Sequence, residues 1–538
     1  MTDKDLFVSG KQFTARCLCI LIFSLLCFTS VAQTGDSTRR IQIIGANSFR
    51  QIVIDSGNTL QTLAGNARVK QGNTILSGDS IAINLTTGVT EVFGNVHIND
   101  ADTLNTYSQY LRYVGTQRIA YLKKNVKLTD GKATLTTEEL EYNLNTGIAE
   151  YKNGGRVVNG STILTSRDAV YYSDTKDVYF KRSVKLTDPK YNITSDSLLY
   201  NTAFRTATFI APTHIVTKDG VVDTESGTYN MQTGEAIFTG RPVFRDSTHS
   251  LTGRNVAYHE ESNTVQVEGN GKLVDSVNKV ILLGDQILLD RNNSSFLGTR
   301  KPVMIIYRDN DSTYLTADTL FSGLRLHDSS TRYKAITDTT INSASKVPPD
   351  SIRYFLGFHH VRIYNDSMQA VSDSLYYSTE DSVFRMFKDP VFWNGKTQVT
   401  GDTMYLFTKN QRPERLEVFN KSMVISDAAN GLYNQVAGRT LFAYFKDGQI
   451  DYCRQRGTPA ESIFYPIEED SSYVGMNRSS GDVIDIYFVN KELNKVKFVN
   501  NVNGTLYPIK QIPAGKKELP GFKWLDNRRP KNKLELFE

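Results

Sequence analysis

Apolar side chains alternate with polar ones in short runs along most of this chain. Val96 and Ile98 flank one polar residue, and Val184 and Leu186 do the same. A spacing of two places such side chains on one face of a β-strand, and the Thr, Val, Ile and Tyr content of the runs is typical of strands. Gly-containing turns, such as NTG at 145–147, separate the runs. The pattern predicts an all-β fold without an amphipathic helix of convincing length.

Two short signatures recur about every thirty residues. The first is Gly or Lys followed by Asn-Val and alternating apolar positions, as at Gly94 and Lys124. The second is an acid or a similar residue with apolar side chains two and four places later. Its copies begin at 79, 109, 138, 168, 196, 225, 254, 285, 318, 373 and 402. All steps lie between 28 and 33 except one of 55, so residues 323–356 are either an insertion or a degenerate repeat.

Each repeat is long enough for two strands of about 7–10 residues, and two strands cannot bury their own apolar face. Neighbouring units must therefore stack to share a core. We expect an elongated body of about 24 antiparallel strands with a roughly thirty-residue period. Its repeated apolar face lies either closed as a core or open as a groove.

The first 32 residues are typical of a secretory signal. Lys4, Lys11 and Arg16 precede an apolar stretch at 17–28, and small residues then precede Gln33. A lipoprotein modified at Cys27 and an uncleaved membrane anchor are the alternatives. We therefore expect a periplasmic protein, in which association with the outer membrane is an open possibility. After cleavage one cysteine, Cys453, remains, which excludes an internal disulfide and a cysteine-based metal site.

Composition excludes several classes of function. The 62 Lys and Arg residues nearly balance the 57 Asp and Glu residues, which argues against a nucleic-acid-binding protein. The tripeptide GKT at 395–397 lacks the glycine of a phosphate-binding loop, and no Gly-x-Ser-x-Gly motif occurs. We therefore predict no enzymatic activity and no cofactor. His359 and His360 are adjacent, which makes them poor joint metal ligands on a strand, so we predict no metal site.

The recurrent acids, such as Asp79 and Asp168, allow two interpretations. They are either a ladder of calcium ligands or hydrogen-bond acceptors for backbone N–H groups where a strand bends, and one acid per repeat favours the second. The end of the chain departs from the repeat. We expect these regions after the signal: repeats at 33–322, the insertion or degenerate repeat at 323–356, further repeats at 357–445, a C-terminal cap at 446–508, and a basic, Pro-containing tail at 509–538. The tail is either a solvated end or a segment that docks on a membrane or a partner.

Three segments, LAGNARV at 63–69, GDSIAI at 78–83 and VFGNVHI at 92–98, resemble the OstA-like, LptA-type lipopolysaccharide-transport family. The resemblance extends through the repeats over about 40–445. It implies a V-shaped β-jellyroll with an apolar groove that holds lipid acyl chains. It also implies three kinds of partner: an inner-membrane extraction complex, an outer-membrane translocon, and further copies joined end to end. The chain is longer than simple bridge proteins of this family and lacks room after residue 450 for a large outer-membrane barrel.

The leading hypothesis is a non-enzymatic periplasmic carrier of lipopolysaccharide. The alternatives are a structural or adhesive β-repeat protein of the cell surface and a β-helix enzyme that acts on glycans. The candidate groove lining consists of the apolar and Tyr positions of the two signatures. These are Val96, Ile98, Val126, Leu128, Leu140, Tyr142, Val170, Tyr172, Val184, Leu186, Leu198, Tyr200, Tyr229, Tyr258, Leu375 and Tyr377.

Overall fold

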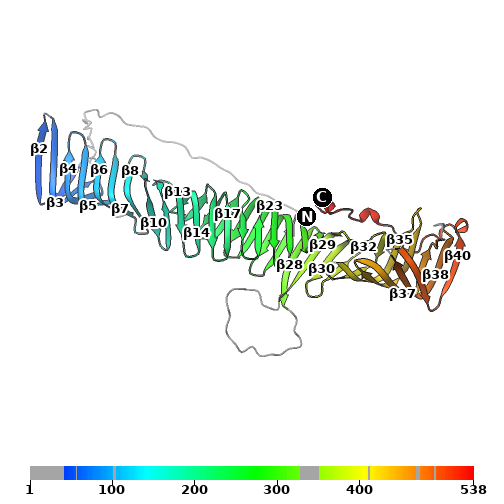
Figure 1. Ribbon diagram of the computed structural model, residues 1–538. Helices are drawn as coiled ribbons and strands as arrows, with labels where there is room; N and C mark the ends of the chain where they lie inside the picture. Colours follow the sequence, from blue (N-terminus) through cyan, green and yellow to red (C-terminus); the bar gives the residue numbers. More distant parts are fainter. Residues whose placement is uncertain are drawn as a thin grey trace, which may run out of the picture.

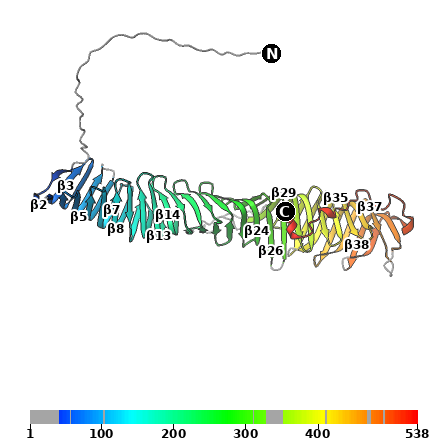
Figure 2. The same ribbon diagram turned by 90° about the horizontal axis from the view of Figure 1, so that it is seen from above.

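A computed structural model describes residues 41–537 except 56, 101–103, 309–310, 327–350, 410–411, 468–472 and 490–491. The expected signal at 1–32 lies outside the described residues. The described chain is all-β and elongated, with strands stacked in sequence order from the N-terminal to the C-terminal end (Figures 1 and 2). All its strand pairs are antiparallel, as the alternating pattern predicts.

The strands form two ladders that face each other across an apolar interior. Long strands bend near their middle and contribute one half to each ladder. They are β3 (Asn58–Gln71), β4 (Thr74–Asn84), β5 (Val89–Asp100), β6 (Leu104–Val114), β7 (Ile119–Thr129), β8 (Ala133–Asn143), β13 (Asp177–Thr187), β14 (Tyr191–Asn201), β23 (Thr264–Asp275), β24 (Val280–Asp290), β29 (Ser351–Asn365), β30 (Met368–Ser378), β35 (Arg412–Asp427), β36 (Tyr433–Lys446), β37 (Gln449–Phe464) and β38 (Gly475–Val489).

Short strands complete each ladder. Those of ladder A are β2 (Ser48–Asp55), β9 (Ile148–Tyr151), β12 (Asp168–Tyr172), β15 (Thr206–Phe209), β18 (Ser226–Asn230), β19 (Glu235–Thr239), β22 (Asn255–His259), β25 (Ser295–Thr299), β28 (Thr319–Leu326), β31 (Val383–Phe387), β34 (Thr403–Lys409) and β39 (Glu492–Val499). Those of ladder B are β1 (Gln42–Gly45), β10 (Gly155–Asn159), β11 (Thr162–Ser166), β16 (Thr213–Thr217), β17 (Gly220–Thr224), β20 (Val243–Arg245), β21 (His249–Thr252), β26 (Val303–Arg308), β27 (Asp311–Thr316), β32 (Val391–Asn394), β33 (Thr397–Thr400) and β40 (Asn503–Pro508).

The bend between the ladders is a pair of residues with positive φ. Gly94 and Asn95 have φ of 67° and 46°, and Lys124 and Asn125 have φ of 65° and 53°. The strand register slips at the same points, between Phe93 and Val96 for example. Left-handed backbone strains most side chains by about 1–2 kcal/mol per residue, and Gly and Asn tolerate it best. The first signature therefore marks a corner inside a strand and not the end of one, so the predicted strands of 7–10 residues were too short.

The recurrent acid belongs to the same corner. Asp79 accepts hydrogen bonds from Asn95 Nδ2 at 3.1 Å, and Asp285 accepts one from the backbone N–H of Asn270 at 3.2 Å. Asp168 pairs with Arg182 at the next type of corner. Each acid lies on the strand that neighbours the bend. This is the hydrogen-bonding role that the pattern favoured over calcium binding.

The two ladders also join around a ring. In ladder A the pairing runs from β14 through β15, β18, β19 and β22 to β23. In ladder B it runs from β14 through β16, β17, β20 and β21 to β23. These ten strands form a closed barrel. The predicted open V along the whole chain is corrected at this point.

The long step in the repeat lies within one hairpin of ladder A. Strands β28 and β29 pair continuously from Thr319 opposite Phe358 to Leu326 opposite Ser351. The residues that connect them, 327–350, lie outside the described residues. The ladder is regular on both sides, so the extra length of 323–356 belongs to a long hairpin connection between two paired strands.

The interior holds two buried apolar clusters. One extends from Leu63 to Phe238 and the other from Leu251 to Phe488. Phe244 and Tyr258 pack against both clusters. The second cluster is densely filled by large side chains. Cys453 lies fully buried in it, and burial raises the pKa of its thiol, so it remains a protonated apolar side chain.

The C-terminal segment crosses the outer face of ladder B. After β40 the chain runs back along the strands toward β29, with short 3₁₀ turns at Ile509–Gln511, Asp526–Arg528 and Lys533–Leu536 (Figures 1 and 2). We call residues 512–537 the strap. Buried glutamines on successive strands hold its backbone and side chains, namely Gln435 to Lys517 and Leu519, Gln398 to Lys523 and Leu525, and Gln369 to Arg529.

Apolar side chains of the strap cover an apolar outer surface. Leu519 lies in a cluster with Met423 and Ile463, and Leu525 packs against Val391 and Trp393. The tail is therefore neither a solvated end nor extended away from the body. It docks on its own sheet, and the strands beneath it are buried on both faces. The segment expected as a cap, 446–508, contains β37 to β40, which continue both ladders.

Candidate functional site

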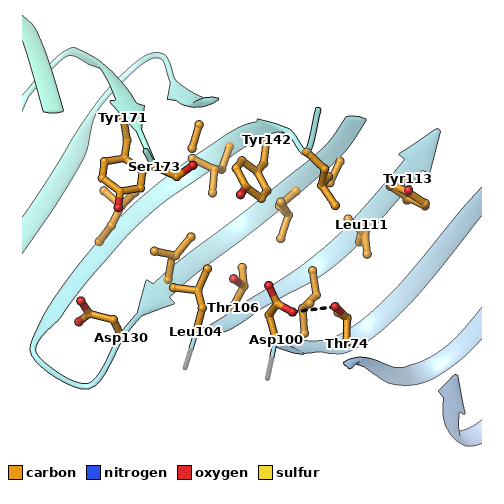
Figure 3. A pocket seen from close by; sticks show the side chains of 18 of the residues that line it. Thr74, Asp100, Leu104, Thr106, Leu111, Tyr113, Asp130, Tyr142, Tyr171 and Ser173 are labelled. Carbon is orange, nitrogen blue, oxygen red and sulfur yellow. Dashed lines mark hydrogen bonds between the residues drawn. The ribbon is translucent and has the colours of Figure 1, made fainter. Parts of the chain in front are cut away.

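An apolar cavity opens between the ladders in the N-terminal third of the described chain. It has a volume of about 520 Å³ and lies between β3 and β14 (Figure 3). This size is within the range of about 300–1,000 Å³ that is common for small-ligand pockets.

Both ladders contribute to its wall. Ladder A and its turns contribute Thr90, Leu111, Tyr113, Ala120, Leu122, Leu140, Tyr142, Leu144, Ala149, Tyr151, Ala169, Tyr171, Ser173, Lys176, Val178 and Thr202. Ladder B and the chain before it contribute Ile41, Val69, Gln71, Thr74, Leu76, Ile98, Asp100, Leu104, Thr106, Leu128, Asp130, Ala133, Leu135 and Val157. Most of these side chains are aliphatic or aromatic, so the cavity suits an apolar ligand.

Polar groups gather where the turns of the two ladders approach each other. Tyr142 and Tyr171 of ladder A lie opposite Asp100 and Asp130 of ladder B (Figure 3). Asp100 accepts a hydrogen bond of 2.8 Å from Thr74 Oγ1. Asp130 accepts from the backbone N–H groups of its own turn at 2.9 and 2.7 Å. The cavity is thus apolar inside and polar at its mouth, as an amphipathic ligand requires.

The phenol groups of the cavity are uncharged at neutral pH. Burial raises the pKa of Tyr142 and of Tyr171, and the nearby charges of Asp100 and Asp130 raise them further. Burial raises the pKa of Tyr151 to about 12, although its hydrogen bond to Ser166 opposes the shift. Neutral hydroxyls leave the inner wall free of charge, which favours hydrocarbon over an ionic ligand.

Residues 39–196, which contain almost all of this wall, match the sequence profile of the OstA-like protein family. This segment is OstA-like. Among solved structures the chain is similar to LptH from Pseudomonas aeruginosa, described as the LptA-homologous periplasmic component of the lipopolysaccharide transport device. The identity is 21%, the match covers 21% of this chain and 82% of LptH, and the TM-score is 0.19. Comparison with curated protein sequences gives no match.

Four of the predicted lining residues line the cavity of the OstA-like segment: Ile98, Leu128, Leu140 and Tyr142. Others point inward but are packed into the two core clusters. These are Val96, Val126, Val184, Leu186, Leu198, Tyr200, Tyr229, Tyr258, Leu375 and Tyr377. The predicted face is thus largely interior, while the described cavity occupies its N-terminal part.

Val170 and Tyr172 are the exception, because they lie on the outer face. In β12 the buried residue is Ala169, and Tyr171 lines the cavity, whereas Tyr172 is 40% exposed. Tyr171 pairs with Ala149 of β9 in the ladder, and Val170 pairs with the charged Glu150. Counting forward from Asp168 placed the strand one residue out of register, and a shift of one residue exchanges the two faces of a strand.

The sequence contains a signal that finds the correct residue. Tyr142, Tyr171, Tyr200, Tyr229 and Tyr258 follow one another at intervals of 29 residues, whereas Tyr172 breaks the series. The same interval backward from Tyr142 gives Tyr113, which also lines the cavity and was missed. Asp100 and Asp130 were missed because their turns do not carry either signature.

Metal and membrane features were sought along the described chain. Its His, Cys, Asp and Glu side chains form no group of three or more that could hold a metal ion. His359 and His360 bond to different acids on different strands, Asp373 at 3.1 Å and Asp318 at 2.9 Å. Nor does the described part contain a helix that is long and apolar enough to cross a membrane.

Proposed function

We propose that this protein is a non-enzymatic periplasmic carrier of lipopolysaccharide, and that the cavity of its OstA-like segment holds acyl chains of the lipid. The observation that carries the proposal is the apolar cavity of about 520 Å³ between the two ladders. It lies within the segment that matches the OstA-like family. LptH, to which the chain is similar, is a component of lipopolysaccharide transport by its own description.

The chemistry of the cavity suits a lipid better than a polar solute. Each methylene moved from water into such a site contributes about 0.8 kcal/mol to binding. The inner wall contributes Leu and Ala side chains from both ladders, whereas hydroxyl and carboxylate groups lie at the mouth. Acyl chains inside and a hydrated head group at the mouth satisfy both regions.

The two ends of the stack are the places where partners would pair. At the first end β1 and β2 each pair only with β3 among the described residues, and Phe49 and Val53 of β2 are exposed. At the last end, β39 and β40 pair only with β38 in the described chain. Open strand edges bind other strands through main-chain hydrogen bonds. The proposed partners are an inner-membrane extraction complex, an outer-membrane translocon, and a second copy of the chain.

Site-specific photo-crosslinking tests the lipid site with a matched control on the adjacent residue. Tyr171→p-benzoylphenylalanine places the crosslinker in the cavity, and Tyr172→p-benzoylphenylalanine places it on the outer face of the same strand. We expect lipopolysaccharide adducts from the first variant in intact cells and at least tenfold fewer from the second, because the two side chains point to opposite faces. Mass spectrometry of the adduct identifies the lipid.

Equal labelling at the two positions, or labelling by peptide fragments alone, would contradict the proposal. Depletion gives an independent test. Loss of a carrier traps newly made lipopolysaccharide at the inner membrane, whereas loss of an adhesive surface protein leaves lipopolysaccharide transport unchanged. Density-gradient separation of the two membranes after depletion distinguishes these results.

A further inference from the structure

The two ladders come into contact across the interior immediately beyond the cavity. Tyr191, the first residue of β14 in ladder B, packs edge-on against Tyr229 of β18 in ladder A. Their ring centroids lie 5.2 Å apart with an angle of 87° between the planes, and Tyr191 is buried. The cavity wall ends before this contact, since its last members along the chain are Val178 and Thr202.

Two ion pairs join the turns of the ladders over the same region. Lys190 Nζ lies 2.6 Å from Glu260 Oε1, and Arg291 Nη2 lies 3.8 Å from Asp219 Oδ2. Lys190 and Asp219 belong to turns of ladder B, and Glu260 and Arg291 to turns of ladder A. Exposed pairs of this kind contribute little individually, so the buried aromatic contact is the main element of the closure.

Tyr191 departs from the residues at the same register in earlier repeats. Thr74, Leu104, Ala133, Thr162 and Tyr191 each begin a strand half of ladder B, at intervals of 29 or 30 residues. The first three line the cavity, and none of the four that precede Tyr191 carries a ring. Opposite them stands the tyrosine column of ladder A. The interior therefore closes at the repeat in which a second aromatic side chain meets that column.

The geometry points to Tyr191 as the residue that sets the inner end of the lipid cavity. This inference rests on the proposed function. Hydrocarbon chains enter between the ladders over the repeats that begin at Thr74, Leu104 and Ala133, and the Tyr191–Tyr229 contact stops them from passing deeper. The chain thus has a lipid-accessible N-terminal part followed by a part whose closed interior excludes lipid while this contact holds.

The repeat supplies a reciprocal test. Tyr191→Ala gives this repeat the side chain that Ala133 has two repeats earlier, and so extends the cavity. Ala133→Tyr introduces the ring two repeats early and so shortens it. Tyr191→Phe retains the ring and is the matched control. The probe is dansyl-undecanoic acid, a fluorescent fatty acid, titrated into the full chain, and bound probe per chain is measured by equilibrium dialysis.

We expect Tyr191→Ala to bind about twice as much probe as the wild type, Tyr191→Phe to bind the same amount, and Ala133→Tyr to bind less than half, following the change in accessible apolar wall. Circular dichroism establishes that each variant is folded, and Ala133→Tyr decides the outcome if Tyr191→Ala is not folded. Wild-type binding that none of the variants changes overturns the role of Tyr191 and leaves the carrier function standing. A wild-type chain that binds neither the probe nor lipid A overturns both.

Discussion

The backbone N–H of Leu525 donates a hydrogen bond of 2.7 Å to Oε1 of Gln398, a fully buried side chain on β33. The same amide group donates from Nε2 to the carbonyl of Lys523 at 2.8 Å. One glutamine thus replaces the neighbouring strand that the strap lacks. Similar bonds from Gln435 fix the strap one strand pair further along.

Gln398→Ala is expected to destabilise the C-terminal part of the protein by about 1–3 kcal/mol. The substitution leaves a buried N–H and a buried carbonyl without partners, and each such group costs the free energy of its lost hydration. Urea unfolding followed by tryptophan fluorescence measures the change, because Trp393 and Trp524 both lie under or in the strap.

Gln61→Ala is the control for this prediction. Gln61 makes a side-chain hydrogen bond of 3.1 Å to Gln51 at an exposed site, so its loss is compensated by water. A Gln398 variant as stable as the Gln61 variant would show that the strap is not held by this amide.

The corners predict effects of opposite sign for two substitutions. Gly94→Ala is expected to destabilise by about 1–2 kcal/mol, because residue 94 has φ of 67° and the new methyl group would press on the Asp79 carboxylate. Lys124→Gly is expected to stabilise by up to about 1 kcal/mol, because Lys124 occupies the equivalent position with φ of 65° and glycine relieves that strain.

Thermal unfolding of the two variants beside the wild type tests this pair. A decrease in melting temperature for Lys124→Gly as large as that for Gly94→Ala would mean that backbone entropy outweighs strain at the corners. The interpretation of the first signature as a left-handed corner would then be wrong in its energetic part.

The strand pattern, the repeat and the family resemblance were all accessible from sequence, because period-two alternation is a local property. Gly94 and Asn95 were recognised as a signature, but their role as a bend inside one strand was not. A sequence pattern shows which residues recur and not whether the chain turns or continues there. The exact side-chain register was lost at Val170, where one extra residue separates the acid from the inward face.

The strap could not be predicted for a different reason. Its sequence is basic and rich in proline, which is equally typical of a solvated tail. The relevant signal lies in the strands that it covers. Around Val391 and Met423 the apolar residues run without alternation, and such runs indicate strands that are buried on both faces. What covers the second face is decided by contacts between positions more than one hundred residues apart, such as Gln398 and Leu525.

The stability of the protein should fall at both acid and alkaline pH through one buried pair. Burial alone would raise the pKa of Asp275, but hydrogen bonds from His249 and Asn278 lower it to about 2. The same partnership with Asp275, opposed by burial and aided by Asp246, raises the pKa of His249. Asp275 therefore stabilises the fold above its ordinary pKa of 3.8, and this contribution is lost as the pH falls toward 2. The contribution of His249 is present below 6.5 and is lost as the pH rises through its raised pKa.

Asp275→Asn is expected to lower the free energy of unfolding at pH 6 by about 2 kcal/mol and to reduce its pH dependence in both windows. The measurement is urea unfolding of wild type and variant between pH 2 and 9. A constant difference between the two proteins across that range would contradict the coupling of Asp275 to His249.

Filling the cavity should weaken lipid binding without affecting the outer surface. Ala149 of β9 lines the cavity, and the adjacent Glu150 is on the opposite face of the same strand. Ala149→Trp is expected to raise the Kd for dansyl-undecanoic acid about tenfold or more, because displacing two methylenes of the ligand removes about 1.6 kcal/mol. Glu150→Trp adds the same indole outside and should leave the Kd unchanged.

Comparison of these two variants separates the cavity from non-specific adsorption of fatty acid to an apolar sheet. Adsorption depends on exposed apolar area, which Glu150→Trp increases and Ala149→Trp does not, so it predicts tighter binding by the first variant and an unchanged Kd for the second. Binding inside the ladders predicts the reverse order. Because the two positions are adjacent on one short strand, a general loss of folding would affect both, and only occupancy of the interior distinguishes Ala149→Trp from its neighbour.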